Sequence, residues 1–582
     1  MRFILIAFYL LLIPTIVISQ QKTIHKEIVA VLNDIKEYNN KEWKKDSINH
    51  HPLRSHTEDT YLSKYNFYKK ANAKLKLINK NTLSFDDQIN LELLRHVVLD
   101  TIAQYHYKSY LNPILSDVGF HTWLARHTNT GLNSRKDAEQ YIILLQDVPR
   151  YVDEYLQLMR KGLALGISQP KIILNGYETT YTNHIVDTVE QSFFWKPLAN
   201  RPATITEADW QALQANAHGI IKKDVIGSYK RIKAFFDQEY LPKARTTLGA
   251  SHFPNGRAFY EDRVRHYTTT NRTSEEVYQI GLKEVERIKA EMDKVMKDVN
   301  FKGNFKEFIS YLRTEPKFYP ETADDLLKEA SFISKKVDGK LPSLFGKLPR
   351  QPYTVVPVPD YLAPSFTAGR YSPAPITSKR SGEYWVNTHS LLSRTLYTLE
   401  ALTLHEAVPG HHLQIALTQE LDHLPEFRRG LYINAFGEGW GLYSEYLGHE
   451  MGFYKDPYSL FGRLTYEMWR ACRLVIDVGI HTKEWTREQA VTYLADYTAL
   501  SLHEVNTEIN RYISWPGQAL AYKMGEIKIK EMRKRAEDTL KKDFDVRVFH
   551  DMVLSNGTVT LSILEMMTDR FIQQQLKKKK KI

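Results

Sequence analysis

Cysteine is almost absent from this chain of 582 residues, because Cys472 is the only one. A single thiol excludes an intramolecular disulfide, even in a compartment whose redox conditions would allow one. The fold must therefore be held together by its core. Hydrophobic residues make up 43% and charged residues 25% of the chain, which is ordinary for a globular protein and argues against disorder. We expect Cys472 to lie in the core of a helix.

Long apolar runs are also lacking, except at the start of the chain. Arg2 precedes an apolar run from Phe3 to Ile18, which is typical of a secretory signal peptide cleaved near Ser19. An uncleaved anchor is the alternative, although Pro14 interrupts the run. We expect an exported protein, periplasmic or secreted. No cysteine stands at the expected cleavage site, which argues against a lipoprotein anchored through cysteine.

The chain carries little excess charge beyond one short segment. Lys and Arg exceed Asp and Glu by 79 to 68, giving +11, and the run Lys577 to Lys581 supplies almost half of the excess. No nucleic-acid motif accompanies this charge, so we expect no nucleic-acid partner. We interpret residues 577–582 as a solvated basic tail; weak contact with an anionic envelope surface is the alternative. The sequence does not define an oligomeric state.

Apolar residues recur at three- and four-residue spacing over most of the chain, which predicts a mainly α protein. We expect two lobes, roughly 20–350 and 351–576. The predicted helices are these: Phe85–Tyr107, Asp137–Leu163, Asp209–Glu239, Ser274–Val299, Leu391–Leu404, Ala435–Gly448, Phe461–Val478, Arg487–Leu502 and Val505–Tyr512. Six prolines between residues 351 and 388 break any helix there, and Tyr384–Thr388 is typical of a strand within a hairpin.

The run from His405 to His412 has the composition of a metal site. His405 and Glu406 match the first half of the H-E-x-x-H helix, in which two histidines four residues apart share one face. Pro409 stands where the second histidine would be, so the helix should break there. Gly410 allows the chain to turn back, which makes either His411 or His412 the second ligand.

Several segments resemble the DUF885 family, itself similar to the helical zinc peptidases typified by thimet oligopeptidase and carboxypeptidase Taq. The resemblance rests on His405–Gln414, Glu438–Glu445 and Arg511–Gly525. It implies a helical zincin-like bowl with a deep cleft and a small β-hairpin or sheet before the metal-binding helix. It also implies Zn²⁺ held by His405, His411 and Glu438. Glu445, two helical turns after Glu438, is either a partner of a ligand imidazole or an exposed acid.

The resemblance also suggests how a peptide would be bound and cleaved. Glu406 would be the general base, and Tyr512 or Tyr522 would stabilise the oxyanion, with Gln518 nearby. Glu383–Asn387 would be an edge strand that pairs with substrate, with Arg370, Tyr371 and Asn387 lining the cleft. The predicted activity is hydrolysis of short peptides. The alternatives are a hydrolase of a non-peptide amide or ester, and an exported non-catalytic binding or scaffold protein with a structural metal.

Overall fold

The computed structural model describes residues 24–129, 131–360 and 362–579, and it confirms a mainly helical fold with one small sheet. The expected signal peptide, residues 1–19, and the lysines at 580 and 581 lie outside the described residues. None of the helices in the described part has the length and apolar character needed to cross a membrane.

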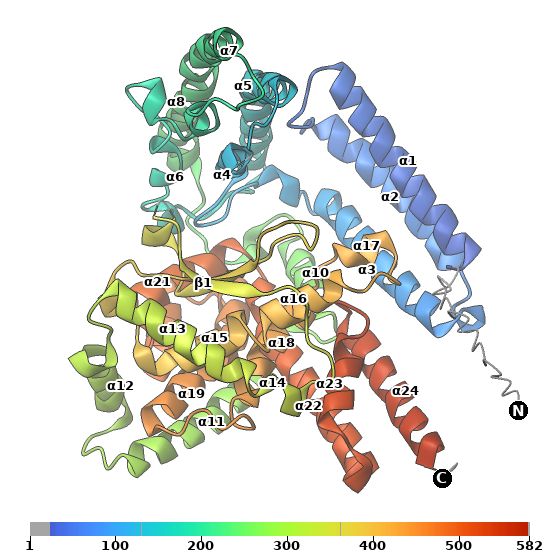
Figure 1. Cartoon of the computed structure of the whole chain (residues 1–582), viewed down its shortest axis with the longest axis vertical. Coiled ribbons are helices and arrows are strands. Elements are labelled where there is room, and N and C mark those ends of the chain that lie inside the picture. The colour runs from blue at the N-terminus through green and yellow to red at the C-terminus, as the bar shows by residue number, and fades with distance from the viewer. Residues whose placement is uncertain (1–23, 130, 361, 580–582) are drawn as a thin grey trace, which may run out of the picture.

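Two groups of helices stand away from the main body (Figure 1). The first is a hairpin of α1 (Lys26–Ile48) and α2 (Glu58–Leu77), followed by α3 (Phe85–His106). The second contains α4 (Phe120–Leu124), α5 (Arg135–Ala164), α6 (Thr179–Thr182), α7 (Glu207–Ile220), α8 (Ile226–Phe235) and α9 (Leu241–Lys243). The helix predicted over Asp209–Glu239 is divided between α7 and α8, because the turns at 221–225 and 236–240 are wider than α-helical turns.

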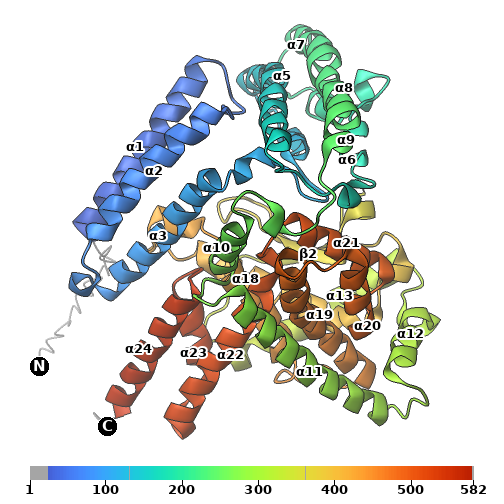
Figure 2. The same ribbon diagram turned by 180° about the vertical axis from the view of Figure 1, so that it is seen from behind.

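The next helices already belong to the main body (Figure 2). They are α10 (Gly256–Thr268), α11 (Ser274–Asp298), α12 (Phe305–Thr314), α13 (Ala323–Asp338) and α14 (Leu341–Leu344). Thr273 begins α11 with a reciprocal cap, in which its hydroxyl accepts from Glu276 N–H and the Glu276 carboxylate accepts from Thr273 N–H. α11 packs along α19, the most buried helix of the main body.

The rest of the body is built around α19, which is buried over nearly its whole length and carries the buried Cys472. The helices here are α15 (Leu399–Glu406), α16 (His411–Gln419), α17 (Glu426–Arg429), α18 (Asn434–Leu447), α19 (Pro457–Thr482), α20 (Arg487–Tyr497), α21 (Leu502–Ser514), α22 (Ala521–Leu540), α23 (Val546–Leu554) and α24 (Leu561–Lys579). The basic segment expected as a tail from residue 577 starts within α24.

The sheet has three strands, β1 (Tyr353–Pro357), β2 (Gly369–Ser372) and β3 (Gly382–Val386), in the order β1-β3-β2. β3 is parallel to β1 and antiparallel to β2. The prediction that Glu383–Asn387 forms an edge strand was wrong, because β3 pairs on both sides. Tyr384 and Val386 are buried, as expected for a central strand. The two edge strands are β1, which is parallel to β3, and β2, which is antiparallel to β3.

Candidate metal centre

The helix breaks where the sequence predicted. α15 ends at Glu406, and α16 begins at His411. Pro409 cannot donate the hydrogen bond that would continue α15. Gly410 is required by close approach and not by its dihedral angles, since a Cβ there would lie 1.9 Å from the carbonyl oxygen of His405. The tight turn brings the first residue of α16 back beside His405.

Three side chains from different helices meet at this turn: His405, His411 and Glu438. One ligand atom from each lies within 4.8 Å of the other two. Glu438 Oε2 is 3.6 Å from His405 Nε2 and 3.4 Å from His411 Nε2. In a tetrahedral site with bonds of about 2.1 Å, neighbouring ligand atoms are about 3.4 Å apart. The two His–Glu distances are therefore compatible with a bound divalent cation.

Glu445 orients the imidazole of His405. Its Oε1 accepts a hydrogen bond of 2.7 Å from His405 Nδ1, which leaves Nε2 directed at Glu438 and His411. Arg470 lies 3.4 Å from the same carboxylate oxygen. Glu445 is only 1% exposed, so the alternative that it is a surface acid is wrong. A carboxylate that fixes the tautomer of a ligand histidine is a recurrent feature of metal sites.

The cluster is strongly polarised. Burial lowers the pKa of His405, but hydrogen bonds to Glu438 and Glu445 outweigh it and raise that pKa to about 10. Burial raises the pKa of Glu438, and the neighbouring His411 and His405 reverse this and hold it well below its usual range. Glu438 is therefore an ionised carboxylate that faces two imidazoles. With a pKa of about 10, His405 carries a proton at neutral pH when no ion is bound, and a cation bound between these groups would have to displace it.

Glu406 is held beside the cluster by the edge strand. The backbone N–H of Tyr371 in β2 donates to Glu406 Oε2 at 2.8 Å. This bond fixes one carboxylate oxygen. The other stays available to take a proton, as a general base must.

His412 is not part of the cluster. It is buried, and its Nδ1 lies 2.9 Å from the hydroxyl of Tyr371. Burial also lowers the pKa of His412 to about 4, so this imidazole is neutral. Of the two histidines that the sequence left open, His411 is the one that meets His405 and Glu438. The Tyr371 ring is buried against His412, and only its backbone reaches Glu406.

The two tyrosines predicted to stabilise an oxyanion lie in different places. Tyr512 was a wrong prediction, because its hydroxyl is buried and accepts from Trp469 Nε1 at 2.7 Å and Arg473 Nε at 2.9 Å. Tyr522 lies close enough to Tyr432 to influence its ionisation, and Arg511 Nη2 is 3.4 Å from the Tyr522 hydroxyl. Tyr522 therefore remains a candidate.

The other predicted substrate-binding side chains also differ in their exposure. Arg370 is exposed on β2, with its guanidinium 4.7 Å from the Phe366 ring. Gln518 is buried and accepts from Arg511. The prediction that Asn387 lines the cleft was wrong. Its amide donates to the carbonyls of Ala363, Phe366 and Thr367, and its oxygen accepts from His389 N–H, so it braces a loop.

Sequence analysis missed Tyr432. Its hydroxyl donates to Glu438 Oε1 at 2.9 Å, on the side of the carboxylate that faces away from the imidazoles. The residue is 42% exposed. Burial of its hydroxyl and the charge of Glu438 raise the pKa of Tyr432 well above its usual value. One tyrosine among 35 gave no signal in the sequence.

Comparison with known proteins identifies relatives over nearly the whole chain. Residues 45–567 match the family described as "Bacterial protein of unknown function (DUF885)". A structure described as "the putative lipoprotein from Colwellia psychrerythraea" is 28% identical, with a TM-score of 0.80, 88% of this chain covered and 92% of the other. A "putative lipoprotein of unknown function from Shewanella oneidensis", 18% identical, shares the fold with a TM-score of 0.67, covering 93% and 98%. A search among curated proteins gave no match.

Proposed function

The chain belongs to the DUF885 family, and we propose that this member is an exported, zinc-dependent peptidase that hydrolyses short peptides. The observation that carries the proposal is the meeting of His405, His411 and Glu438, with Glu406 next to the first histidine in the chain. Two imidazoles and one carboxylate are the ligands of many catalytic zinc sites, which keep a fourth position for water. Two nitrogen donors with one oxygen donor suit zinc better than magnesium or calcium.

Each side chain of the centre has a role in this proposal. An ion held there would activate water and polarise the carbonyl of the substrate. Glu406, fixed by Tyr371 N–H, takes a proton from the attacking water and later gives it to the leaving amine. Tyr432, whose hydroxyl bonds to Glu438 Oε1, and Tyr522, which lies close enough to Tyr432 to affect its ionisation, are the phenols that would donate to the developing negative charge.

The edge strand β2 supports a peptide as substrate. The N–H of Asn387, just after β3, donates to the C=O of Ala368, just before β2. In an antiparallel pair every second residue bonds to the neighbouring strand, so the backbone groups of Gly369 and Tyr371 point away from β3. Glu406 already accepts from the outward N–H of Tyr371. A peptide added along this edge would pair with the backbone of Gly369, because Tyr371 N–H is already taken by Glu406, and it would lie beside the proposed general base. We therefore move the proposed strand-addition site from β3 to β2.

We also propose that the protein acts in the bacterial envelope. The apolar run at residues 3–18 supports export, and the two structural relatives are described as lipoproteins. Fractionation of cells, with detection of the mature N-terminus by mass spectrometry, tests this. A protein found in the cytoplasm with Met1 retained would contradict it.

The first test is metal content by mass spectrometry, in the wild type and in a variant with both His405→Ala and Glu438→Ala. We expect about one zinc per chain in the wild type and none in the variant. A folded wild type that retains no metal after zinc is offered would refute the proposal. Four protein ligands around the ion would instead indicate a structural site, since a catalytic site keeps a water position.

The second test is Glu406→Gln, a substitution that keeps the size of the side chain and an oxygen that can accept from Tyr371 N–H. We expect zinc content to stay unchanged and kcat for peptide hydrolysis to fall by about 10² to 10⁴-fold, the usual contribution of a general base. Wild-type turnover in this variant would show that Glu406 is not the base. Ester and amide substrates measured in parallel separate a peptidase from another hydrolase.

A further inference from the structure

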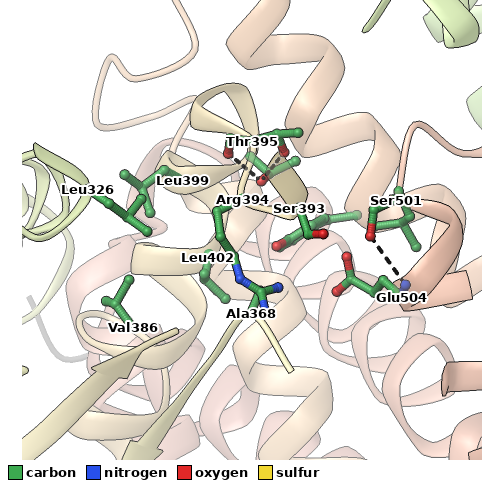
Figure 3. A pocket seen from close by; sticks show the side chains of 13 residues that line it. Leu326, Ala368, Val386, Ser393, Arg394, Thr395, Leu399, Leu402, Ser501 and Glu504 are labelled. Carbon is green, nitrogen blue, oxygen red and sulfur yellow. Dashed lines mark hydrogen bonds between the residues drawn. The ribbon is translucent and has the colours of Figure 1, made fainter. Parts of the chain in front are cut away.

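A small pocket lies between α15 and α21, with Leu399 and Leu402 in its wall and Arg394 and Glu504 among its polar side chains (Figure 3). It has room for about one water molecule. Burial raises the pKa of Glu504 to about 7, and the charge of Arg394 acts in the opposite direction, so the two groups attract each other. We therefore assign no ligand to this pocket.

Two segments of the chain are basic and contain no acidic residue. The first, residues 60–85, has six lysines and covers most of α2 and the turn that leads to α3. The second, residues 570–582, has one arginine and five lysines, and it includes the end of α24. Six and six make +12, against +11 for the whole chain, so all the remaining residues together are close to neutral. The excess charge of the protein is therefore concentrated in these two segments.

The fold brings the two segments together. Lys80, in the turn after α2, has its Nζ 3.9 Å from Met566 Sδ of α24. The guanidinium of Arg570 lies 4.3 Å from the ring centre of Phe85, the first residue of α3. Lys577 follows Arg570 by about two helical turns, or about 10 Å. The ends of α2 and α24 therefore lie at the same end of the molecule (Figure 1). We call this surface the basic face and define it by Lys74, Lys76, Lys80, Lys577 and Lys578, after which the lysine run continues to Lys581.

The charge of the basic face is only partly compensated. Lys74 and Lys80 each have a carboxylate partner, at 2.6 Å and 3.2 Å. Lys76, Lys577 and Lys578 are exposed, and none of them pairs with a carboxylate in the described part of the chain. Clusters of uncompensated lysines bind the headgroups of anionic lipids.

The position of the basic face in the chain favours a membrane as its partner. Leu77 at the end of α2 is 85% exposed, and an apolar side chain among lysines suits the boundary between headgroups and acyl chains. α1 begins nearby, because His25 N–H donates to Asp87 Oδ1 in the first turn of α3. The apolar run ends at Ile18, so at most about 20 Å of chain separates it from Ile24. A run that crosses the membrane during export would hold the basic face next to the bilayer.

We propose that the basic face binds membranes that contain anionic phospholipids, and that it keeps the exported protein at the membrane surface without a lipid anchor. The two structural relatives are described as lipoproteins, whereas this chain has no cysteine at the expected cleavage site. Each lysine near an anionic membrane strengthens binding by about fivefold, so the run from Lys577 to Lys581 contributes about 10³-fold. The inference goes beyond the proposed peptidase activity and does not depend on it.

Sedimentation with lipid vesicles tests the proposal. The exported protein is mixed with phosphatidylcholine vesicles that contain either about 30% phosphatidylglycerol or none. We expect binding to the anionic vesicles to be at least about 100-fold tighter than to the neutral ones, and to be lost at about 0.5 M salt because salt screens the charges. No binding to the anionic vesicles, or equal binding to both kinds, would overturn the proposal.

Variants assign the binding to the basic face. Glutamine at all five positions from Lys577 to Lys581 should weaken binding by more than about 100-fold, whereas arginine at the same positions keeps the charge and should retain it. Lys76→Gln combined with Lys80→Gln should weaken binding by about 10- to 25-fold. The matched control is Lys222→Gln with Lys223→Gln, at exposed positions between α7 and α8, away from the end of α24 (Figure 1). Equal losses in the two double variants would show that net charge, and not the basic face, decides the binding.

Duplex DNA at the same phosphate concentration tests whether the partner is a membrane. Tighter binding to DNA than to anionic vesicles would overturn the proposal in favour of a nucleic-acid partner. Melting temperature, zinc content and peptide hydrolysis should match the wild type in every variant, since the substituted side chains are not part of the candidate metal centre. Failure to bind vesicles would therefore leave the proposed peptidase standing, and absence of peptidase activity would leave the membrane-binding face standing.

Discussion

Glu445 controls which nitrogen of His405 is available to an ion. Its hydrogen bond of 2.7 Å to Nδ1 holds the proton there and leaves Nε2 as the ligand. Glu445→Gln keeps the shape of the side chain but removes the negative charge beside the imidazole. We expect zinc affinity to fall by about 10- to 100-fold, as for other partners of ligand histidines. Competition with a chromogenic chelator measures the change.

The control for this variant is Glu488→Gln, on the exposed face of α20. It makes the same chemical change far from the cluster along the chain and should leave zinc affinity unchanged. If Glu445→Gln also leaves affinity unchanged, the hydrogen bond to His405 does not contribute to metal binding.

Asp477 makes the stability of the fold depend on pH. Burial raises its pKa to about 7, although hydrogen bonds from Tyr260 and Gly517 act in the opposite direction. The unfolded chain loses this proton near pH 4, so the folded state binds more protons between about pH 4 and pH 7. The free energy of unfolding should therefore fall as pH rises through that range, by up to about 4 kcal/mol from this residue alone.

Asp477→Asn tests this dependence, because the amide oxygen can still accept from Tyr260 and Gly517. We expect the variant to match the wild type at pH 5 and to exceed its stability at pH 8, measured by urea unfolding. Asp422→Asn, at an exposed position, is the control and should follow the wild type at both pH values. Parallel pH profiles for Asp477→Asn and the wild type would show that Asp477 is not the group responsible.

At the scale of elements, the position of Glu438 depends on how closely α18 approaches α22. A Cβ on Gly525 would lie 1.9 Å from the carbonyl oxygen of Ala435 and 2.7 Å from the Cα of Gly439. Gly525→Ala must push the two helices apart. We expect a loss of about 1–3 kcal/mol of stability, as for other overpacked sites. Zinc affinity should also fall, because Gly439 is adjacent to Glu438.

Gly227→Ala is a matched control for that substitution. Gly227 lies inside α8, and a Cβ there would meet no atom within 4 Å. The alanine should raise stability by about 0.5–1 kcal/mol through its better helix propensity. Thermal unfolding and zinc titration of both variants measure the two effects. If Gly525→Ala behaved like Gly227→Ala, the close approach would not constrain the centre.

The elements also show what local sequence could and could not predict. The start of α11 at Ser274 and the break at Pro409 follow from neighbouring residues and were predicted correctly. The helix predicted over Leu391–Leu404 was only partly correct, because α15 begins at Leu399, after two short 3-10 turns.

The order of the strands was not predicted correctly, because strand pairing depends on contacts between residues distant in the chain. An example is the hydrogen bond between the hydroxyls of Tyr384 in β3 and Thr403 in α15. The roles of Tyr432 and Asn387 were missed for the same reason, since each depends on partners that only the folded chain brings close.

At the scale of the whole molecule, one hydrophobic core joins the second group of helices, α4 to α9, to the candidate metal centre. It contains Tyr229 and Phe236 from the second group as well as Phe436 and Trp440 from α18. Residues so connected should unfold together. Since an ion at a thousand times its Kd stabilises the folded state by about 4 kcal/mol, removing zinc should lower the whole transition.

Scanning calorimetry with and without a chelator tests this coupling. We expect one main transition that moves to lower temperature when zinc is removed, and no shift in the variant with His405→Ala and Glu438→Ala. Two separate transitions, of which only the higher or the lower responds to the chelator, would show that the first 250 residues fold independently of the centre. The shared core argues for the single transition, because unfolding either part exposes apolar surface of the other.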